Sequence, residues 1–162
     1  MKDDIKDIAY YKTPIGTAKI TGDKDGIIEV SVMDDKIPSS VIIPESLQAC
    51  VRQLDEYFQK KRTSFYLKLN PQGTKFQKNV WNELQNIPYG KTITYLDQSK
   101  KMDSVKAIRA IASANGKNPI WIIIPCHRVI GSDGSLTGYA GGIWRKKWLL
   151  EHENPSKQIS LF

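Results

Sequence analysis

Short stretches of alternating apolar and polar residues make up the first part of the chain. Three of them, at 8–12, 17–21 and 27–33, are separated by 14–16 and by 22–26, which contain glycine, proline and aspartate. Alternation bounded by such residues is typical of strands joined by tight turns. The pattern therefore predicts an antiparallel meander.

Apolar residues then recur at the spacing of a helix, from about 44 to 60. Cys50 lies on the apolar side of this helix, which favours a place in the core over a chemical role. The stretch 65–69 alternates again and predicts a further strand. Residues 70–73, which include a proline and a glycine, are expected to link this part to the second half.

Helical spacing predominates after this linker. Thr74 is placed to cap a helix that ends before Pro88. The apolar positions of this helix recur every three or four residues and are Phe76, Val80, Trp81, Leu84 and Ile87. A last helix is expected over 142–153, after a loop at 131–135 that joins two short extended stretches.

Two short helices are expected between these elements. One runs from about Thr94 to Met102, and the other covers 105–115 and is capped by Asp103 or Ser104. Two short helices joined by a tight turn suggest a helix-turn-helix. Three ordinary packed helices would give the same pattern, so both interpretations stay open.

The helix over 105–115 has one face suited to the interior and another suited to a partner. The positions expected to face inward are Val105, Ile108, Ala112 and Ile111. The positions free to face a partner are Lys106, Arg109 and Ser113. The small side chains of Ala107 and Ala110 permit a close approach to the wall of a groove.

These elements together predict an α+β chain with two lobes. Residues 1–70 are expected to form a small antiparallel sheet with a helix, and residues 71–162 a mostly helical lobe that contains the helix-turn-helix. A chain of 162 residues with 40% hydrophobic content can form one core or two small lobes. This length excludes a large multidomain enzyme.

Composition indicates in which compartment the protein acts and whether it binds a metal or a cofactor. No run approaches the roughly 18 apolar residues that a bilayer span requires, and the polar, acidic start is unlike a secretory signal. We therefore expect a cytoplasmic protein that does not bind a membrane. Cys50 and Cys126 alone make a disulfide framework or a cysteine-rich zinc site implausible. We expect no metal and no cofactor.

Excess positive charge lies entirely in the second half. Residues 1–70 carry eleven Lys and Arg against eleven Asp and Glu, whereas residues 71–162 carry thirteen against six, and the net charge is +7. Such a surface attracts a polyanion and gains from counterion release, so nucleic acid is the leading partner and an anionic membrane a weaker one. A merely soluble basic surface is the other interpretation.

The stretch 124–129 places the thiol of Cys126 beside the imidazole of His127, directly after the apolar run 120–124. An imidazole can turn a thiol into a thiolate nucleophile, directly or through a water. Adjacent side chains of an extended strand point to opposite faces, so the pair is expected on a bend, consistent with Pro125. A cysteine next to a histidine is as often structural as catalytic.

The motifs of the second half are more specific. They are 73–77, 80–81, 87–90, 109–110, 114–116, 118–119, Ile124-Pro125-Cys126-His127-Arg128-Val129, 138–142, 145–146 and 148–153. With these motifs the chain resembles the O6-alkylguanine-DNA alkyltransferases, also called methylated-DNA-protein-cysteine methyltransferases. The first lobe resembles the variable N-terminal domain of that family loosely, chiefly at 54–58.

The resemblance implies that Cys126 attacks the alkyl carbon on O6 of a damaged guanine in one displacement. The protein would be consumed, because a thioether has no labile bond, whereas a hydrolase would form a thioester that water cleaves. In the family pattern His127 acts through a water as the base for Cys126, Glu153 holds the imidazole in its tautomer, and Asn118 braces the turn. The distance in sequence between His127 and Glu153 gives no support of its own for this pairing.

The implied partner is double-stranded DNA that contains O6-alkylguanine, bound by a monomer. O6 lies in a stacked pair, so the nucleotide must be extruded to meet a buried thiol. The resemblance assigns the helix over 105–115 to the minor groove, with Arg109 in the vacated space, and gives Tyr95 a part in rotating the phosphate and contacting the base. The implied DNA contacts are Arg109, Ala107, Ala110, Lys106, Ser113, Asn115 and Gly116. The implied base pocket consists of Tyr95, Val129, Tyr139, Ala140 and Trp121.

The sequence leaves two other functions as alternatives. A non-catalytic damage binder similar to the alkyltransferase-like proteins would lack the nucleophile, so Cys126 counts against it. A thiol hydrolase would need an oxyanion-hole signature, which the chain lacks, and it would leave the basic half unexplained. Trp121 departs from the family pattern, because many members have a small residue or a proline at this place.

Overall fold

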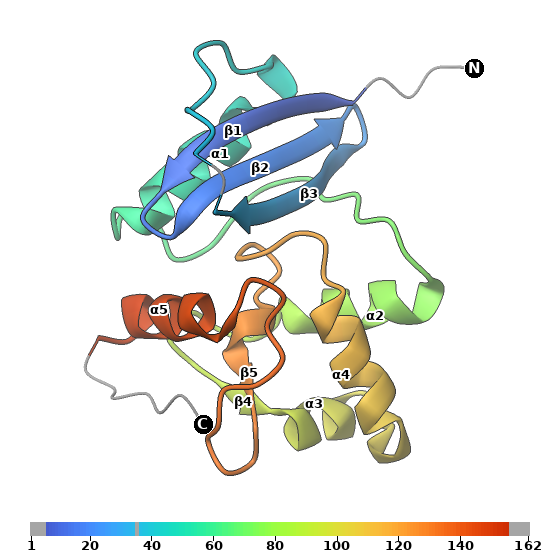
Figure 1. Ribbon diagram of the computed structural model, residues 1–162. Helices are drawn as coiled ribbons and strands as arrows, with labels where there is room; N and C mark the ends of the chain where they lie inside the picture. Colours follow the sequence, from blue (N-terminus) through green and yellow to red (C-terminus); the bar gives the residue numbers. More distant parts are fainter. Residues whose placement is uncertain (1–5, 35, 156–162) are drawn as a thin grey trace. The chain divides into compact units, whose positions relative to one another are not determined.

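Two units make up this protein, whose structure is a computed structural model that describes residues 6–34 and 36–155. The first unit extends to residue 72 and includes 119–123, and the second consists of 73–118 and the residues from 124 onward. A sheet lies in the first unit, and most helices lie in the second (Figure 1). The predicted α+β class is confirmed. No helix within the described ranges has both the length and the apolar character to span a membrane.

The sheet of the first unit is the predicted meander. Strands β1 (Asp7–Thr13), β2 (Gly16–Asp23) and β3 (Gly26–Met33) pair antiparallel in that order. Gly26 has a φ of 133°, and an added Cβ there would lie 2.6 Å from the Lys68 carbonyl oxygen. Glycine is therefore required where the chain turns into β3.

Helix α1 (Glu45–Phe58) covers one face of this sheet (Figure 1). Its buried side includes Leu47, Leu54 and Tyr57, at the helical spacing read from the sequence. Cys50 is fully buried on the same side, as predicted. Burial raises the pKa of the Cys50 thiol to about 12, so this cysteine is not a nucleophile at neutral pH.

Two segments, 68–70 and 119–121, cover the outer edge of β3 in place of a fourth strand. In the second of these, the Val30 N–H donates to the Pro119 carbonyl at 2.9 Å, and the Trp121 N–H donates to the Val30 carbonyl at 2.8 Å. The sheet thereby anchors the chain segment that precedes the predicted nucleophile.

The strand expected over 65–69 is wrong apart from a single bridge at Leu69. The backbone of Tyr66 forms hydrogen bonds with the side chain of Gln53, from α1, and not with a neighbouring strand. Its Oε1 accepts from the Tyr66 N–H at 2.9 Å, and its Nε2 donates to the Tyr66 carbonyl at 3.1 Å. These two hydrogen bonds satisfy the backbone groups that a strand would have used.

Helix α2 (Lys75–Leu84) begins at Thr74, as predicted. The Thr74 hydroxyl accepts from the Gln77 N–H at 3.1 Å, and the Gln77 side chain accepts from the Thr74 N–H at 2.9 Å, which completes a capping box. Trp81 donates its indole N–H to the Ala114 carbonyl at 2.8 Å. This bond joins α2 to a helix 33 positions further along the chain.

Helices α3 (Tyr95–Lys101) and α4 (Ile108–Gly116) form the expected helix-turn-helix pair, with the 3₁₀ turn η1 (Val105–Ala107) between them. The side chains of Gln98 and Asn115 exchange two hydrogen bonds, at 2.9 and 2.7 Å, where both are buried. This reciprocal amide pair satisfies both side chains and ties α3 to α4.

The turn between these helices differs from the prediction in two ways. Val105, expected to face inward, is 50% exposed, because it lies in η1 and the α-helical register begins only at Ile108. Ile111, one turn later, is fully buried. Asp103 and Ser104 were expected to cap the helix, but no side chain caps η1 or α4.

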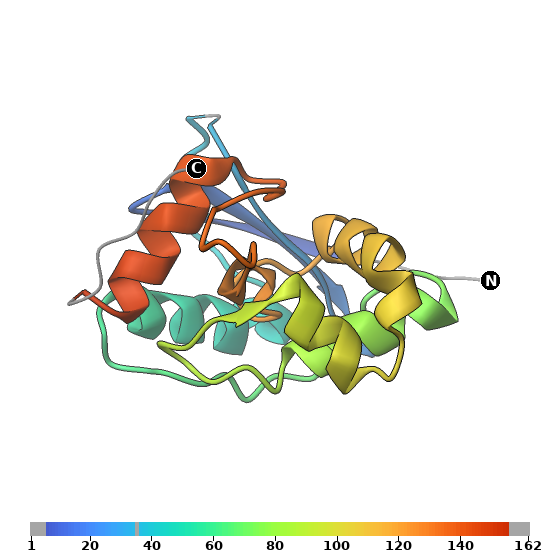
Figure 2. The same ribbon diagram turned by 90° about the horizontal axis from the view of Figure 1, so that it is seen from below.

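A short parallel ladder joins distant parts of the second unit. β4 (Ile93–Thr94) pairs with β5 (Val129–Ile130). β4 runs directly into α3, and β5 directly follows the 3₁₀ turn η2 (Cys126–Arg128). Figure 2 shows this central segment between α5 (Ile143–Glu153) and the α3–α4 pair. The ladder therefore places the start of α3 beside the turn that carries the thiol.

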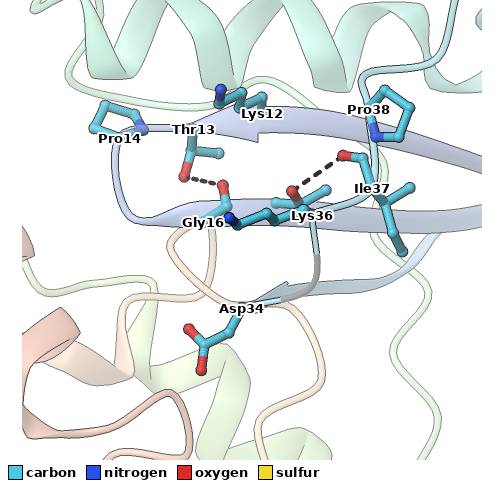
Figure 3. Close-up of a pocket in the computed structure, with 9 residues that line it drawn as sticks. Lys12, Thr13, Pro14, Gly16, Asp34, Lys36, Ile37 and Pro38 are labelled. Carbon is cyan, nitrogen blue, oxygen red and sulfur yellow. Dashed lines mark hydrogen bonds between the residues drawn. The ribbon is translucent and has the colours of Figure 1, made fainter.

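A surface hollow of about 620 Å³ lies in the first unit (Figure 3). The β1–β2 turn and residues 34 and 36–38 line it. The hydroxyls of Thr13 and Thr17 donate to the carbonyls of Gly16 and Ile37, at 2.7 and 3.2 Å. The described lining includes neither cysteine nor histidine, so the chemistry indicated by the sequence belongs to the second unit.

Thr74→Ala removes the side-chain acceptor of the Gln77 N–H, and we expect it to lower the free energy of unfolding by about 1 kcal/mol. Chemical denaturation followed by circular dichroism measures this loss. Lys75→Ala, at an exposed helix position outside the capping box, is the control. Equal stability of the two variants would contradict a contribution from the box.

Candidate active site

The thiol of Cys126 lies in a tight bend. An inverse γ-turn centred on Pro125, with φ −83° and ψ 62°, brings the Cys126 N–H to the Ile124 carbonyl at 2.8 Å, and η2 follows at once. Proline suits this centre because its φ is fixed near the required value. The expected bend is confirmed, and it allows the adjacent Cys126 and His127 to be buried together.

Asn118 joins the nucleophile to the chain that precedes it. The chain leaves the second unit after Asn118 and returns to it at Ile124. The Asn118 side-chain amide donates to the Ile124 carbonyl at 2.8 Å and to the Cys126 Sγ at 3.2 Å. The Asn118 amide thus links the point where the chain leaves the second unit to the point where it returns. It also gives the sulfur a hydrogen bond, which favours the thiolate.

The imidazole of His127 is fully buried against Glu153. Its Nε2 lies 2.8 Å from Oε2 of Glu153. An ionised carboxylate can only accept, so Nε2 carries the hydrogen and Nδ1 is the bare nitrogen. Nδ1 has no hydrogen-bond partner among the residues that the structure describes. The contact with Glu153 therefore leaves Nδ1 as the nitrogen that can take up a proton.

Arg128 is a second partner of Glu153, and the sequence alone did not indicate a role for it. Its Nε donates to Oε1 at 2.8 Å and its Nη2 donates to Oε2 at 3.0 Å, which forms a bidentate ion pair. Its Nη1 donates to the Ile87 carbonyl at 2.7 Å. The available signal was an arginine beside the Cys-His pair in an apolar stretch, but its acceptor lies 25 positions away.

Burial and these contacts determine the charge states. Burial alone would raise the pKa of Glu153, but His127 and Arg128 hold that pKa well below its usual range. Burial lowers the pKa of His127 below its ordinary value, although Glu153 opposes the lowering. At neutral pH His127 is therefore neutral, and Arg128 carries the positive charge that balances Glu153.

Burial also raises the pKa of the Cys126 thiol, while the Asn118 hydrogen bond and the charge of Lys146 oppose the increase in part. The resting thiol is therefore protonated at neutral pH. It becomes a nucleophile when a base removes its proton, and the adjacent His127 is the residue predicted to act as that base. The arrangement is suited to attack by sulfur on an electrophile that enters the site.

Two tyrosines predicted for the base pocket belong to this site. The Tyr95 hydroxyl donates to the Thr137 carbonyl at 3.1 Å, and the buried Tyr139 lies two residues further along the same loop. Burial raises the pKa of both hydroxyls, and the charge of Cys126 raises both further. Both tyrosines therefore keep their protons. The other predicted pocket residues of this unit are Val129, buried in β5, and Ala140, exposed on the loop.

Two expectations concern the surroundings of the site. Trp121 belongs to the first unit, where it pairs with β3, so its place in the base pocket stays a prediction. For a metal centre, three or more His, Cys, Asp or Glu side chains would have to come together. The described part of the chain contains no such group.

The predicted DNA contacts lie along η1 and α4. The exposed members of this set are Lys106, Arg109, Ala110, Ser113 and Gly116, and Ala107 is half-buried. Asn115 is the exception and requires a correction, because its side chain is buried and exchanges two hydrogen bonds with Gln98. An amide satisfied in the interior does not reach a partner at the surface.

Two family profiles match the chain. The 6-O-methylguanine DNA methyltransferase, DNA binding domain, matches residues 75–155, and the 6-O-methylguanine DNA methyltransferase, ribonuclease-like domain, matches residues 8–71. The chain belongs to the 6-O-methylguanine DNA methyltransferase family. The resemblance read from the motifs is thereby confirmed, and it extends to the first lobe, where the motifs were weak.

Relatives in this methyltransferase family align along nearly the whole chain. A methylated-DNA--protein-cysteine methyltransferase of Methanosarcina acetivorans is 46% identical over 150 residues, 90% of this chain and 96% of the relative. The crystal structure of Mycobacterium tuberculosis O6-methylguanine methyltransferase matches with a TM-score of 0.83 at 36% identity, over 97% of this chain and 98% of that chain. A structure of Mycobacterium tuberculosis OGT in complex with DNA matches with a TM-score of 0.80 at 39% identity, over 90% of this chain and 91% of that chain.

Arg128→Met should destabilise this methyltransferase strongly, because the buried Glu153 would lose the bidentate ion pair that compensates its burial. We expect the free energy of unfolding to fall by about 3 kcal/mol or more in urea denaturation. Loss of Arg128 should also raise the pKa of His127, which NMR titration of the imidazole measures, because the guanidinium is one of the causes that lower it.

Lys147→Met is the control for this variant. Lys147 and Glu151 form a partly exposed pair 4.0 Å apart, which should contribute less than about 1 kcal/mol. A loss of stability in Arg128→Met no larger than in Lys147→Met would show that the buried pair does not hold the site together.

Proposed function

We propose that this protein repairs DNA by direct damage reversal and transfers a methyl or other alkyl group from O6 of guanine to its own Cys126. One observation carries the proposal: in a chain of this family, the Cys126 thiol is hydrogen-bonded by Asn118 and adjoins the buried His127–Glu153 pair. The relative from Methanosarcina acetivorans is named for transfer to a protein cysteine. The second unit, which holds these residues and the helix-turn-helix, binds DNA and performs the transfer.

The reaction begins with removal of the thiol proton. His127 takes this proton at Nδ1 through a bridging water and becomes an imidazolium whose Nε2–H still donates to Glu153. The carboxylate stabilises the new charge and keeps the ring oriented. Asn118 donates to the sulfur as it becomes negative. The thiol therefore loses its proton when His127 is in place to accept it.

The thiolate then attacks the alkyl carbon in a single displacement. A carbon–sulfur bond forms as the bond from that carbon to O6 breaks, and the electron pair of the broken bond stays on the guanine. Tyr95, whose pKa burial raises, keeps its proton and contacts the base. The guanine anion then takes up a proton, which replaces the one that left the thiol. The product is repaired guanine. The thioether has no labile bond, so each protein molecule reacts once.

The exposed side of η1 and α4 supports the DNA-binding part of the proposal. Lys106, Arg109 and Lys117 place positive charge there, and Ala110 and Gly116 add little bulk. A buried thiol does not reach O6 inside a base stack, so the nucleotide is flipped out of the duplex. Arg109 fills the space that it leaves, and the lysines bind phosphates in a salt-dependent way.

One copy of the chain is sufficient for this reaction, because the nucleophile, the base and the groups that hold them come from a single unit. We infer a monomer that acts in a reducing compartment such as the cytoplasm, where Cys126, a free cysteine in the structure, stays a thiol. The alternative of a non-catalytic damage binder has less support, because it leaves the buried thiol and its neighbouring base without a use.

Equimolar protein should remove the methyl group from O6-methylguanine in duplex DNA once per molecule. Intact-mass spectrometry should then show a gain equal to one CH₂ group, the difference between a thiol and its methyl thioether. Cys126→Ser should bind damaged duplex and gain no mass. Cys50→Ser should react like the wild type, because Cys50 lies in the core of the first unit. Transfer to Cys50, or no gain at all, would disprove the assignment.

Arg109→Ala should slow repair of duplex DNA more than reaction with the free base O6-methylguanine, because the free base needs no flipping. We expect the single-turnover rate on duplex to fall about tenfold, which corresponds to about 1.4 kcal/mol, and the rate on the free base to change little. Arg52→Ala, which removes an exposed arginine of the first unit, is the charge-matched control. An equal loss on both substrates would exclude a flipping role for Arg109.

A further inference from the structure

Trp144 is an exposed tryptophan at the start of α5, beside the loop that carries two of the predicted pocket residues. It is 51% exposed. Tyr139 and Ala140, both predicted for the base pocket, lie four or five positions before it in the sequence. Contacts between this tryptophan and the loop therefore act close to the predicted pocket.

The indole of Trp144 lies under a buried arginine. The central guanidinium carbon of Arg145 is 4.6 Å from the centre of the Trp144 ring, within the range of a cation–π contact. Arg145 itself is only 5% exposed. A contact with the face of a ring leaves the N–H groups of the guanidinium available for acceptors. The indole thus fixes the guanidinium without occupying its donors.

The guanidinium in turn holds the loop. Nη1 of Arg145 donates to the buried Gly141 carbonyl at 3.0 Å. Gly141 lies within a turn that the Gly142 N–H closes by donating to the Tyr139 carbonyl at 3.0 Å. At Gly142 the φ is 92°, and an added Cβ would lie 3.4 Å from Cδ1 of Trp144, so the indole also lies against the turn. Arg145 and Trp144 thus contact two successive residues of this turn.

We propose that Trp144 and Arg145 form a latch that fixes the turn over 139–142 and thereby limits the size of the alkyl group that the site accepts. This inference rests on the proposed transfer to Cys126 and adds a substrate preference to it. Arg145 acts through the Gly141 carbonyl, and Trp144 acts through Arg145. Both are therefore positioning residues.

The turn begins with Tyr139 and Ala140, so the latch fixes one wall of the predicted pocket. A methyl group is small, and a fixed wall keeps its carbon in line with the sulfur. A benzyl group is larger and requires this wall to move. Loosening the latch is therefore expected to slow methyl transfer and to favour benzyl transfer in comparison.

The test is the single-turnover rate on duplex DNA that contains either O6-methylguanine or O6-benzylguanine. Trp144→Leu keeps an apolar side chain at an exposed position but removes the ring. In this variant we expect the benzyl rate, relative to the methyl rate, to rise at least about threefold. If the wild type transfers no benzyl group, the expected result is that Trp144→Leu does. Arg145→Met removes the donor to the Gly141 carbonyl and should raise the same ratio.

Two further variants separate the latch from general stability, which changes both rates by the same factor and leaves their ratio unchanged. Trp144→Phe keeps an aromatic face against Arg145 and should keep the ratio near that of the wild type. Trp148→Leu is the matched control, because Trp148 stacks on His152 of the same helix, with the ring centres 4.9 Å apart. It should leave the ratio unchanged. The proposal fails if Trp144→Leu or Arg145→Met keeps the wild-type ratio or lowers it.

Hydrogen exchange tests the latch without damaged DNA. The amide of Gly142, whose N–H closes the turn, should exchange about tenfold faster in Trp144→Leu, while the amides of α2 exchange as in the wild type. Equal exchange of Gly142 in the two proteins would show that the indole does not fix the turn. A failure of alkyl transfer itself is a different result, because it would appear as no mass gain on Cys126 in the wild type.

Discussion

Glu153 places an ionised carboxylate in the interior of the second unit, and the geometry of the site follows from the partners that this charge requires. A buried carboxylate is stable only when it is paired and hydrogen-bonded. Arg128 supplies two donors, His127 supplies one, and the Gly90 N–H lies 3.4 Å from Oε1. Two of these three residues come from the single turn η2, so the last turn of α5 must lie against it. Cys126, the first residue of η2, is thereby held beside a base.

Arg128 and His127 share one carboxylate, and the division of charge between them decides the chemistry. Because a guanidinium keeps its proton, Glu153 stays ionised while His127 is neutral. A neutral imidazole with a bare Nδ1 can accept the thiol proton, and the imidazolium then finds its counter-charge already in place. Without the guanidinium, the buried carboxylate would favour a protonated His127, which is no base. In the proposed mechanism the ion pair therefore serves the reaction as well as stability.

Features that depend on neighbours in the sequence could be predicted, and features that depend on distant partners could not. The Thr74 cap and the bend at Cys126 involve residues within a few positions of each other, so the pattern was sufficient. The alternation at 65–69 was misleading, because the side chain of Gln53 forms the backbone hydrogen bonds that a neighbouring strand would have formed. Asn115 was expected among the DNA contacts from the family resemblance, but the similarly polar Gln98 satisfies it in the interior. In both places a glutamine on another element replaced the expected partner.

The two buried cations of the site show what a linear pattern does not contain. Both Arg128 and Lys146 stand in motifs that carried the family resemblance, yet the pattern gave neither a role, since their acceptors lie on other elements. Their residue types fit their surroundings. The fork of Arg128 matches two carboxylate oxygens and holds its proton, so Glu153 stays ionised throughout. The compact ammonium of Lys146 donates to a single carbonyl, that of Thr137, at 2.8 Å, and burial lowers its pKa to about 8. If Arg128 and Lys146 were exchanged, a lysine that can lose its proton would stand beside Glu153. His127, the proposed base for Cys126, would then no longer stay neutral.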